Sequence, residues 1–89
     1  MEQIRLIISG TVQGVGFRYF IKSWAKDLGV TGWAKNSESG QVEAVLQGDK
    51  RTIKKLTDLC KKGPMLAEVK DIQIVDEAAK EKYGEFTII

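Results

Sequence analysis

A glycine-rich turn joins a strand pattern to a helix pattern near the start of this chain, and this junction limits the possible folds more than any other feature. Apolar side chains alternate with a period of two in residues 4–9, which predicts a strand that is nearly apolar on both sides. From residue 16 to residue 28 they recur at helical spacing, and Gly29 follows as a helix stop. The chain must therefore pass from a sheet into a helix through one tight turn.

Strand and helix patterns continue to alternate after this first helix. Residues 30–35 and 41–47 read as two strands around a turn cluster at 36–40, which predicts a hairpin. Asp49 is a candidate N-cap for a second helix, which Gly63 would end. The apolar face of that helix would consist of Ile53, Leu56, Leu59 and Cys60.

The remaining patterns complete a recognisable order of elements. Residues 69–75 read as a fourth strand, and residues 78–83 as a charged turn or a loose helical segment. A short strand is expected around Phe86 and Ile88. The order is that of a ferredoxin-like α/β sandwich, an α+β fold with both helices on one face of a mainly antiparallel sheet. We expect residues 1–89 to form a single domain of this kind.

The composition excludes several kinds of active site. The chain contains no histidine, which removes His-based general base catalysis, Ser-His-Asp and Cys-His arrangements and nearly all zinc sites. Cys60 is the only cysteine, so no internal disulfide can form, and its place in a helical pattern predicts a buried apolar residue. No metal or other cofactor is expected.

Charge and hydropathy indicate which partners to expect. A net charge of +2 is too weak to indicate nucleic acid by itself. Phe17 and Phe20 open a helix rather than lie on a third strand, so we interpret them as core residues and not as RNA-stacking aromatics. The first residues lack the apolar core of a signal peptide, and no apolar run approaches the roughly 20 residues of a membrane span. A cytoplasmic protein without a nucleic-acid or membrane partner is therefore expected.

The glycine-rich turn has the features of an anion site. Its glycines allow the backbone N–H groups of residues 14–17 to converge on one anion, and the start of the helix adds positive potential. Arg18, one of only three arginines, adds a planar fork of donors suited to phosphate. Neither nucleotide motif fits, because Tyr19 stands where the dinucleotide fingerprint needs its third glycine, and a Walker A Gly-Lys-Ser/Thr is absent. The turn predicts a site for a phosphoryl group.

Asn36 is a second candidate, at the end of the strand predicted over residues 30–35. Its uncharged amide offers one acceptor and two donors, which suits the holding of a water molecule. A turn-forming asparagine is the simpler interpretation, and the residues alone leave both open.

Two motifs, taken together, resemble the signatures of a known enzyme family. Residues 8–18, which read ISGTVQGVGFR, resemble the N-terminal signature of acylphosphatases. Residues 32–36, which read GWAKN, resemble the second signature when taken with Gly40, Val42 and Gly48 downstream. Both match without a gap, and the resemblance covers essentially the whole chain.

The resemblance implies a function and assigns roles to particular residues. Acylphosphatases cleave acyl phosphates to a carboxylate and inorganic phosphate, within the ferredoxin-like sandwich expected above. By resemblance, Arg18 is the phosphate-binding arginine and Asn36 positions the attacking water. The phosphate-binding loop maps to Gln13, Gly14, Val15, Gly16, Phe17 and Arg18. The implied partners are a small-molecule acyl phosphate and inorganic phosphate, the latter as product and competitive inhibitor.

Other interpretations remain open on the sequence. A ferredoxin-like domain can instead be a regulatory anion sensor or bind RNA, and acylphosphatase-like domains also occur within larger carbamoyl-phosphate-processing enzymes. A monomer is expected, although the terminal residues 86–89 could either seal a sheet edge or pair with another chain.

Overall fold

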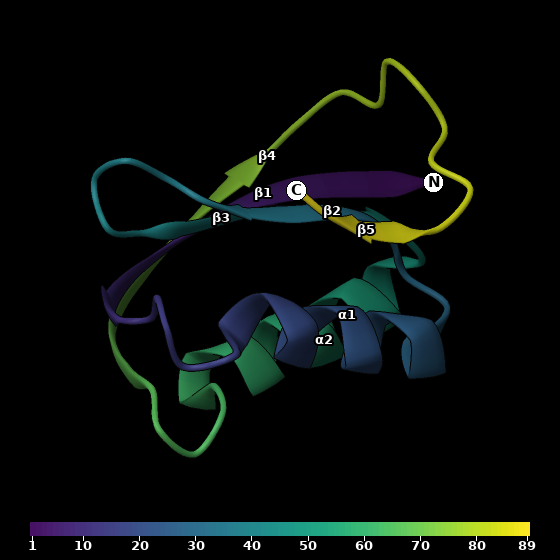
Figure 1. Cartoon of the computed structure of the whole chain (residues 1–89). Coiled ribbons are helices and arrows are strands. Elements are labelled where there is room, and N and C mark those ends of the chain that lie inside the picture. The colour runs from purple at the N-terminus through teal and green to yellow at the C-terminus, as the bar shows by residue number, and fades with distance from the viewer.

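The computed structural model describes residues 1–89 and has the predicted order of elements. These are β1 (Glu2–Thr11), α1 (Phe17–Leu28), β2 (Thr31–Asn36), β3 (Val42–Gly48), α2 (Lys50–Lys62), β4 (Glu68–Asp76) and β5 (Phe86–Ile88). The sheet has the order β4-β1-β3-β2-β5, and only the β2–β5 pair is parallel. Both helices cover the same face of the sheet (Figure 1). The predicted ferredoxin-like fold is confirmed.

Element boundaries differ from the predicted ones by a few residues. β1 extends two residues beyond the predicted strand at each end, because its polar end residues still pair with β3 and β4. β3 extends one residue beyond the predicted strand and ends at Gly48, since this residue pairs with Glu2. Residues 78–83 form no helix and lie in an irregular connection between β4 and β5. The terminal strand does seal the β2 edge of the sheet.

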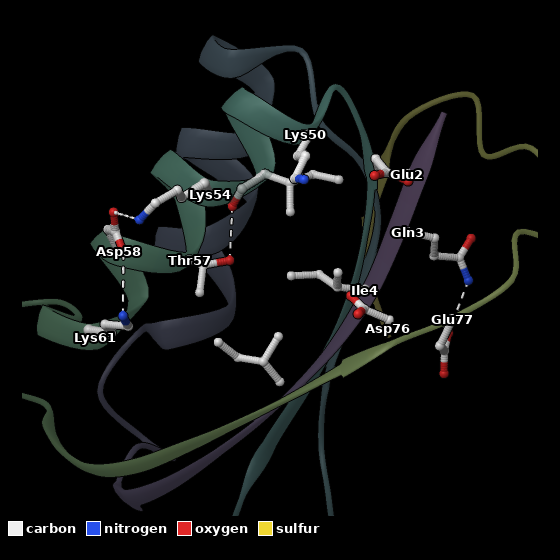
Figure 2. Close-up of a pocket in the computed structure, with 12 residues that line it drawn as sticks. Glu2, Gln3, Ile4, Lys50, Lys54, Thr57, Asp58, Lys61, Asp76 and Glu77 are labelled. Atoms are coloured by element: carbon white, nitrogen blue, oxygen red, sulfur yellow. Dashed lines mark hydrogen bonds and ion pairs between the residues drawn. The ribbon is translucent and has the colours of Figure 1, made fainter.

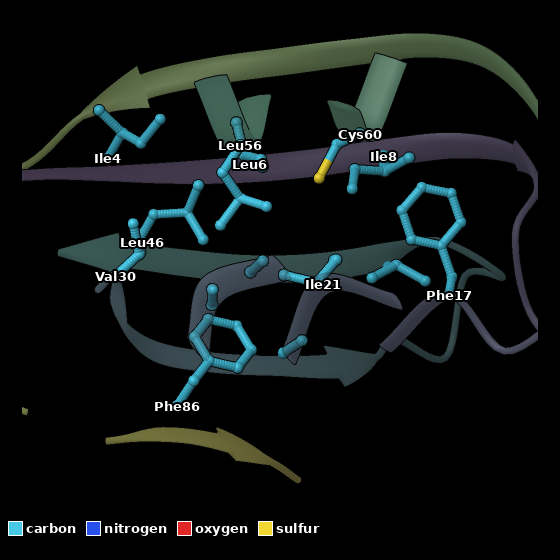
Figure 3. Packing of buried hydrophobic residues seen from close by; sticks show 14 of the residues in the cluster. Ile4, Leu6, Ile8, Phe17, Ile21, Val30, Leu46, Leu56, Cys60 and Phe86 are labelled. Atoms are coloured by element: carbon cyan, nitrogen blue, oxygen red, sulfur yellow. The ribbon is translucent and has the colours of Figure 1, made fainter. Parts of the chain in front are cut away.

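The core lies between the helix layer and the sheet. Phe17 and Ile21 of α1 belong to one buried cluster with Leu6 and Ile8 of β1 (Figure 3). Burial of each such side chain stabilises the fold by about 1.5–3 kcal/mol. Trp24 shares the helical spacing of this face but remains 39% exposed. It lies in a shallow groove between α1 and α2 rather than over the sheet.

Cys60 lies within this core, as predicted. It is fully buried on α2, and desolvation raises the pKa of its thiol to about 12. The side chain therefore packs as a small apolar group. Neither helix is long and apolar enough to span a bilayer.

The opposite face of the sheet carries a network of charged side chains. The Arg5 guanidinium forms ion pairs with the carboxylates of Glu43 and Glu77, and Gln3 Nε2 donates to Glu77 Oε1 at 3.0 Å. Arg5 also lies over the Trp33 ring, 5.3 Å from its centroid. The hydrogen bond from Arg5, followed by that from Gln3, holds the pKa of the Glu77 carboxyl below its usual range.

This lowered pKa predicts an acid-dependent loss of stability. A carboxyl with a lower pKa in the folded state stabilises the fold above its unfolded pKa, and the contribution disappears as the pH falls through the folded value. Glu77→Gln should remove about 1 kcal/mol or less at neutral pH. In this variant the free energy of unfolding should also decrease less steeply than in the wild type as the pH is lowered. Urea denaturation at several pH values measures both effects, with Glu2→Gln as an exposed control; equal acid slopes in all three proteins would contradict the assignment.

Candidate active site

The turn between β1 and α1 has a backbone that leaves several N–H groups free. Gly14 and Gly16 adopt left-handed conformations with φ of +74° and +79°. The first helical hydrogen bond runs from Phe20 N–H to Gly16 C=O at 3.0 Å, and no side chain caps the helix. The N–H groups of residues 14–19 therefore donate to no group of the protein. A helix start of this kind is suited to bind an anion.

The conformation of Gly16 predicts a measurable effect of a methyl group. A Cβ at this position would meet no atom within 4 Å, so the cost of Gly16→Ala would come from the positive φ alone. We expect a loss of about 1–2 kcal/mol in the free energy of unfolding. Gly84→Ala is a matched control, because that glycine also faces open space and has no positive φ. Equal stability of the two variants in urea denaturation would refute the argument.

Arg18 lies in the first turn of α1 with most of its donors free. Its Nη1 donates to the backbone carbonyl of Ile89 at 3.1 Å, and Ile89 N–H in turn donates to Ala34 C=O at 2.9 Å. No Asp or Glu side chain lies within ion-pair distance of the guanidinium, in contrast to Arg5 with its two acidic partners. The remaining N–H donors of Arg18 are thus available to an anion, while Nη1 is held by Ile89.

Asn36 is the last residue of β2. It pairs with Val42 across the hairpin, and its side chain is exposed. No hydrogen bond within the protein occupies its amide. The turn that follows lies at the same end of the molecule as the β1–α1 turn (Figure 1).

One small cavity brings these groups together. It has a volume of about 130 Å³ and is lined by Val12, Gly14, Gly16, Phe17, Arg18, Tyr19 and Asn36. Arg18 and Asn36 come from different elements and were linked in the sequence only through the resemblance. Two predicted loop residues, Gln13 and Val15, do not line the cavity. Val12 and Tyr19 line the cavity without having been predicted, because neither carries a group that signals phosphate chemistry in the sequence.

The largest hollow on the surface lies elsewhere. It measures about 510 Å³ and separates α2 from the ends of β1 and β4, with Lys50 and Lys54 on one side and Glu2 and Asp76 on the other (Figure 2). Lys54 is already paired with Asp58. None of the predicted site residues lines it. No three His, Cys, Asp or Glu side chains of the protein lie close enough together to hold a metal ion.

Comparison with known proteins agrees with the two motifs. The acylphosphatase family model matches residues 4–88. The chain belongs to the acylphosphatase family. An acylphosphatase of Dehalococcoides mccartyi strain CBDB1 is 44% identical over 89 residues, covering 99% of this chain and 98% of the relative. The crystal structure of acylphosphatase from Bacillus subtilis has 35% identity and a TM-score of 0.96, and the match covers 100% of this chain and 99% of that one.

The same fold also occurs inside a longer protein. Full-length HypF, crystallised in a phosphate- and nucleotide-bound form, matches all of this chain with 33% identity and a TM-score of 0.89, but the match covers only 12% of HypF. The relatives named acylphosphatase match over nearly their whole length instead. Family membership confirms that this acylphosphatase is an enzyme of the hydrolase class.

Proposed function

We propose that this acylphosphatase hydrolyses acyl phosphates through Arg18, the β1–α1 loop and Asn36. Arg18 and the free N–H groups of residues 14–18 bind the phosphoryl oxygens, and Asn36 orients the attacking water. The observation that supports this proposal is the single cavity lined by Arg18, Asn36 and the two left-handed glycines, Gly14 and Gly16. The products are a carboxylate and inorganic phosphate.

The chemistry of the substrate explains how so few groups suffice. The leaving group is a carboxylate. Its conjugate acid has a pKa close to those of the Asp and Glu side chains, at roughly 3.9–4.3. Such a group leaves as the carboxylate anion, so no general acid has to protonate it. Phosphoryl transfer passes through a loose transition state in which the attacking water is weakly bonded, so little activation by a base is needed. Positioning and charge stabilisation then supply most of the rate enhancement.

Arg18 contributes both charge and geometry to this step. A guanidinium presents parallel N–H donors that match two oxygens of a phosphoryl group. The hydrogen bond from Nη1 to the Ile89 backbone oxygen limits rotation of the guanidinium. The backbone N–H groups supply further donors to the remaining phosphoryl oxygen, since they donate to no group of the protein.

Asn36 contributes orientation rather than proton transfer. An amide neither gains nor loses a proton near neutral pH, but it accepts one hydrogen bond from water and donates two others. Its freedom from protein partners leaves the whole amide available. Water held on the side of phosphorus opposite the acyl oxygen lies in line for displacement.

Competing interpretations differ in measurable ways. A regulatory sensor would bind phosphate and leave acyl phosphates intact, and an RNA-binding domain would lose affinity steeply with added salt. On the outer face of the sheet, Trp33 is half-buried and both Arg5 and Lys35 lie over its ring, an arrangement that does not favour base stacking. A cytoplasmic, monomeric, single-domain enzyme without a cofactor remains our prediction.

Benzoyl phosphate provides the direct test of this function. The protein is incubated with benzoyl phosphate and a chelator, and loss of the anhydride absorbance is followed with and without inorganic phosphate. We expect hydrolysis that phosphate inhibits competitively. Binding of phosphate without turnover would instead favour the sensor, and turnover insensitive to phosphate would remove the proposed site.

A further inference from the structure

We propose that Gln13 is a positioning residue that couples the phosphate-binding loop to Asn36. This inference rests on the proposed function. Gln13 directly precedes Gly14 in the loop, and Ser37 directly follows Asn36 at the end of β2. The Gln13 side chain connects these two segments, and so sets the position of the Asn36 amide relative to a bound phosphoryl group.

The connection consists of two short hydrogen bonds from one amide nitrogen. Gln13 Nε2 donates to Ser37 C=O at 2.8 Å and to Gln41 C=O at 2.9 Å. The two acceptors lie at opposite ends of the β2–β3 turn. Bonds within the turn, from Ser37 N–H to Gln41 C=O at 2.8 Å and from Gly40 N–H to Ser37 C=O at 3.2 Å, make it one unit. Gln13 thus holds the whole turn against the loop.

These bonds also exclude direct phosphate binding by the same side chain. A glutamine amide nitrogen has two hydrogens, and the two turn carbonyls occupy both. Only Oε1 remains, and a carbonyl oxygen is an acceptor that has no hydrogen to offer a phosphate oxygen. The Gln13 side chain does not line the cavity of Arg18 and Asn36. Any effect of Gln13 on catalysis through its side chain must therefore pass through the turn.

Asn36 depends on such a connection because the sheet holds the hairpin against β1, and only Gln13 bonds the hairpin to the loop itself. Its own amide has no partner in the protein, and its backbone belongs to the hairpin rather than to the β1–α1 turn. Beside the backbone pairing of β1 with β3, a second side-chain connection joins the hairpin to β1 further back, where Gln41 Nε2 donates to Ser9 Oγ at 2.8 Å. Ser9 belongs to β1 and lies before the loop, so this bond connects the hairpin to the sheet and not to the loop. Its removal is therefore a matched control for removal of the Gln13 bonds.

Gln13→Met tests the inference, because methionine has similar length and no donor. We expect kcat for benzoyl phosphate to fall by about 10–100-fold, the scale of a misplacement of about 1 Å. The inhibition constant for inorganic phosphate should change by no more than about twofold, since Arg18 and the loop N–H groups are untouched. Ser9→Ala, which removes only the second connection, should keep wild-type kcat.

A double-mutant cycle separates positioning from a general structural role. In an Asn36→Ala background, Gln13→Met should lower kcat by less than about threefold, because the group that it positions is already absent. Equal losses in both backgrounds, or a phosphate inhibition constant that rises as far as kcat falls, would overturn the inference. If Gln13→Met does not fold by circular dichroism, Gln13→Asn repeats the cycle with an amide one methylene too short to reach both carbonyls.

The same measurements distinguish this inference from the proposed function. Wild-type hydrolysis that Arg18→Ala abolishes and Gln13→Met leaves intact would remove only the role of Gln13. A wild-type protein that does not hydrolyse benzoyl phosphate would remove both.

Discussion

Replacing Arg18 by alanine is expected to lower kcat for benzoyl phosphate by about 10³–10⁵-fold, the range found for arginines that stabilise phosphoryl transfer. The loss is large because no other side-chain cation lines the cavity. Arg18→Lys should recover little of the rate, since an ammonium is a point charge and cannot reproduce two parallel donors. Steady-state kinetics of the two variants measure both effects.

Arg51→Ala is the control for the Arg18 variants. Arg51 is exposed on α2, and its replacement removes the same unit of net charge without touching the cavity. We expect its kcat to equal that of the wild type. Near-normal activity in Arg18→Ala, or full recovery in Arg18→Lys, would exclude the proposed role and leave a binding function for the site.

Replacing Asn36 by alanine is expected to lower kcat by about 10²–10³-fold, the scale for loss of one preorganised polar group. Phosphate should still inhibit with an unchanged constant, because in the proposed role the Asn36 amide orients water and does not contact the phosphoryl oxygens. Kinetics and phosphate inhibition, measured on the same preparation, separate the two quantities. Gln73→Ala, an exposed amide on β4, is the control and should behave as the wild type.

The opposite result for Asn36→Ala would contradict the proposed role of Asn36 in orienting water. A weaker phosphate affinity with preserved kcat would make Asn36 part of the anion site. Water would then be oriented by another group that lines the cavity.

Much of the fold was predictable because it depends on local patterns. The strand of residues 4–9, the helix that ends at Gly29 and the N-cap at Asp49 all appear where the periodicity and the cap residues predicted them. The segment 78–83 was not predictable in the same way, because its alternating charges suit a turn and a weak helix equally. In the structure, Glu81 C=O accepts from buried Gln47, and this tertiary contact selects the irregular path.

The sequence predicted which side chains form the candidate site better than it predicted the contacts that hold them in place. Arg18 and Asn36 stand out within motifs, and both line one cavity. The turn carbonyls that engage Gln13 and the Ile89 carbonyl that anchors Arg18 carry no sequence signal, because every residue has such a group. Gln13 and Val15 were grouped with the loop, although neither lines the cavity.

The sequence by itself determined the class of fold and the family, and it singled out the two candidate side chains, because periodicity, glycine placement and motif spacing are local properties of the chain. Only the tertiary structure decided which backbone carbonyls meet Arg18 and Gln13, and which side chains share the cavity. Those contacts join residues that are 24 to 71 positions apart. Their geometry depends on how the sheet pairs and how the helices pack on it, which no single segment specifies.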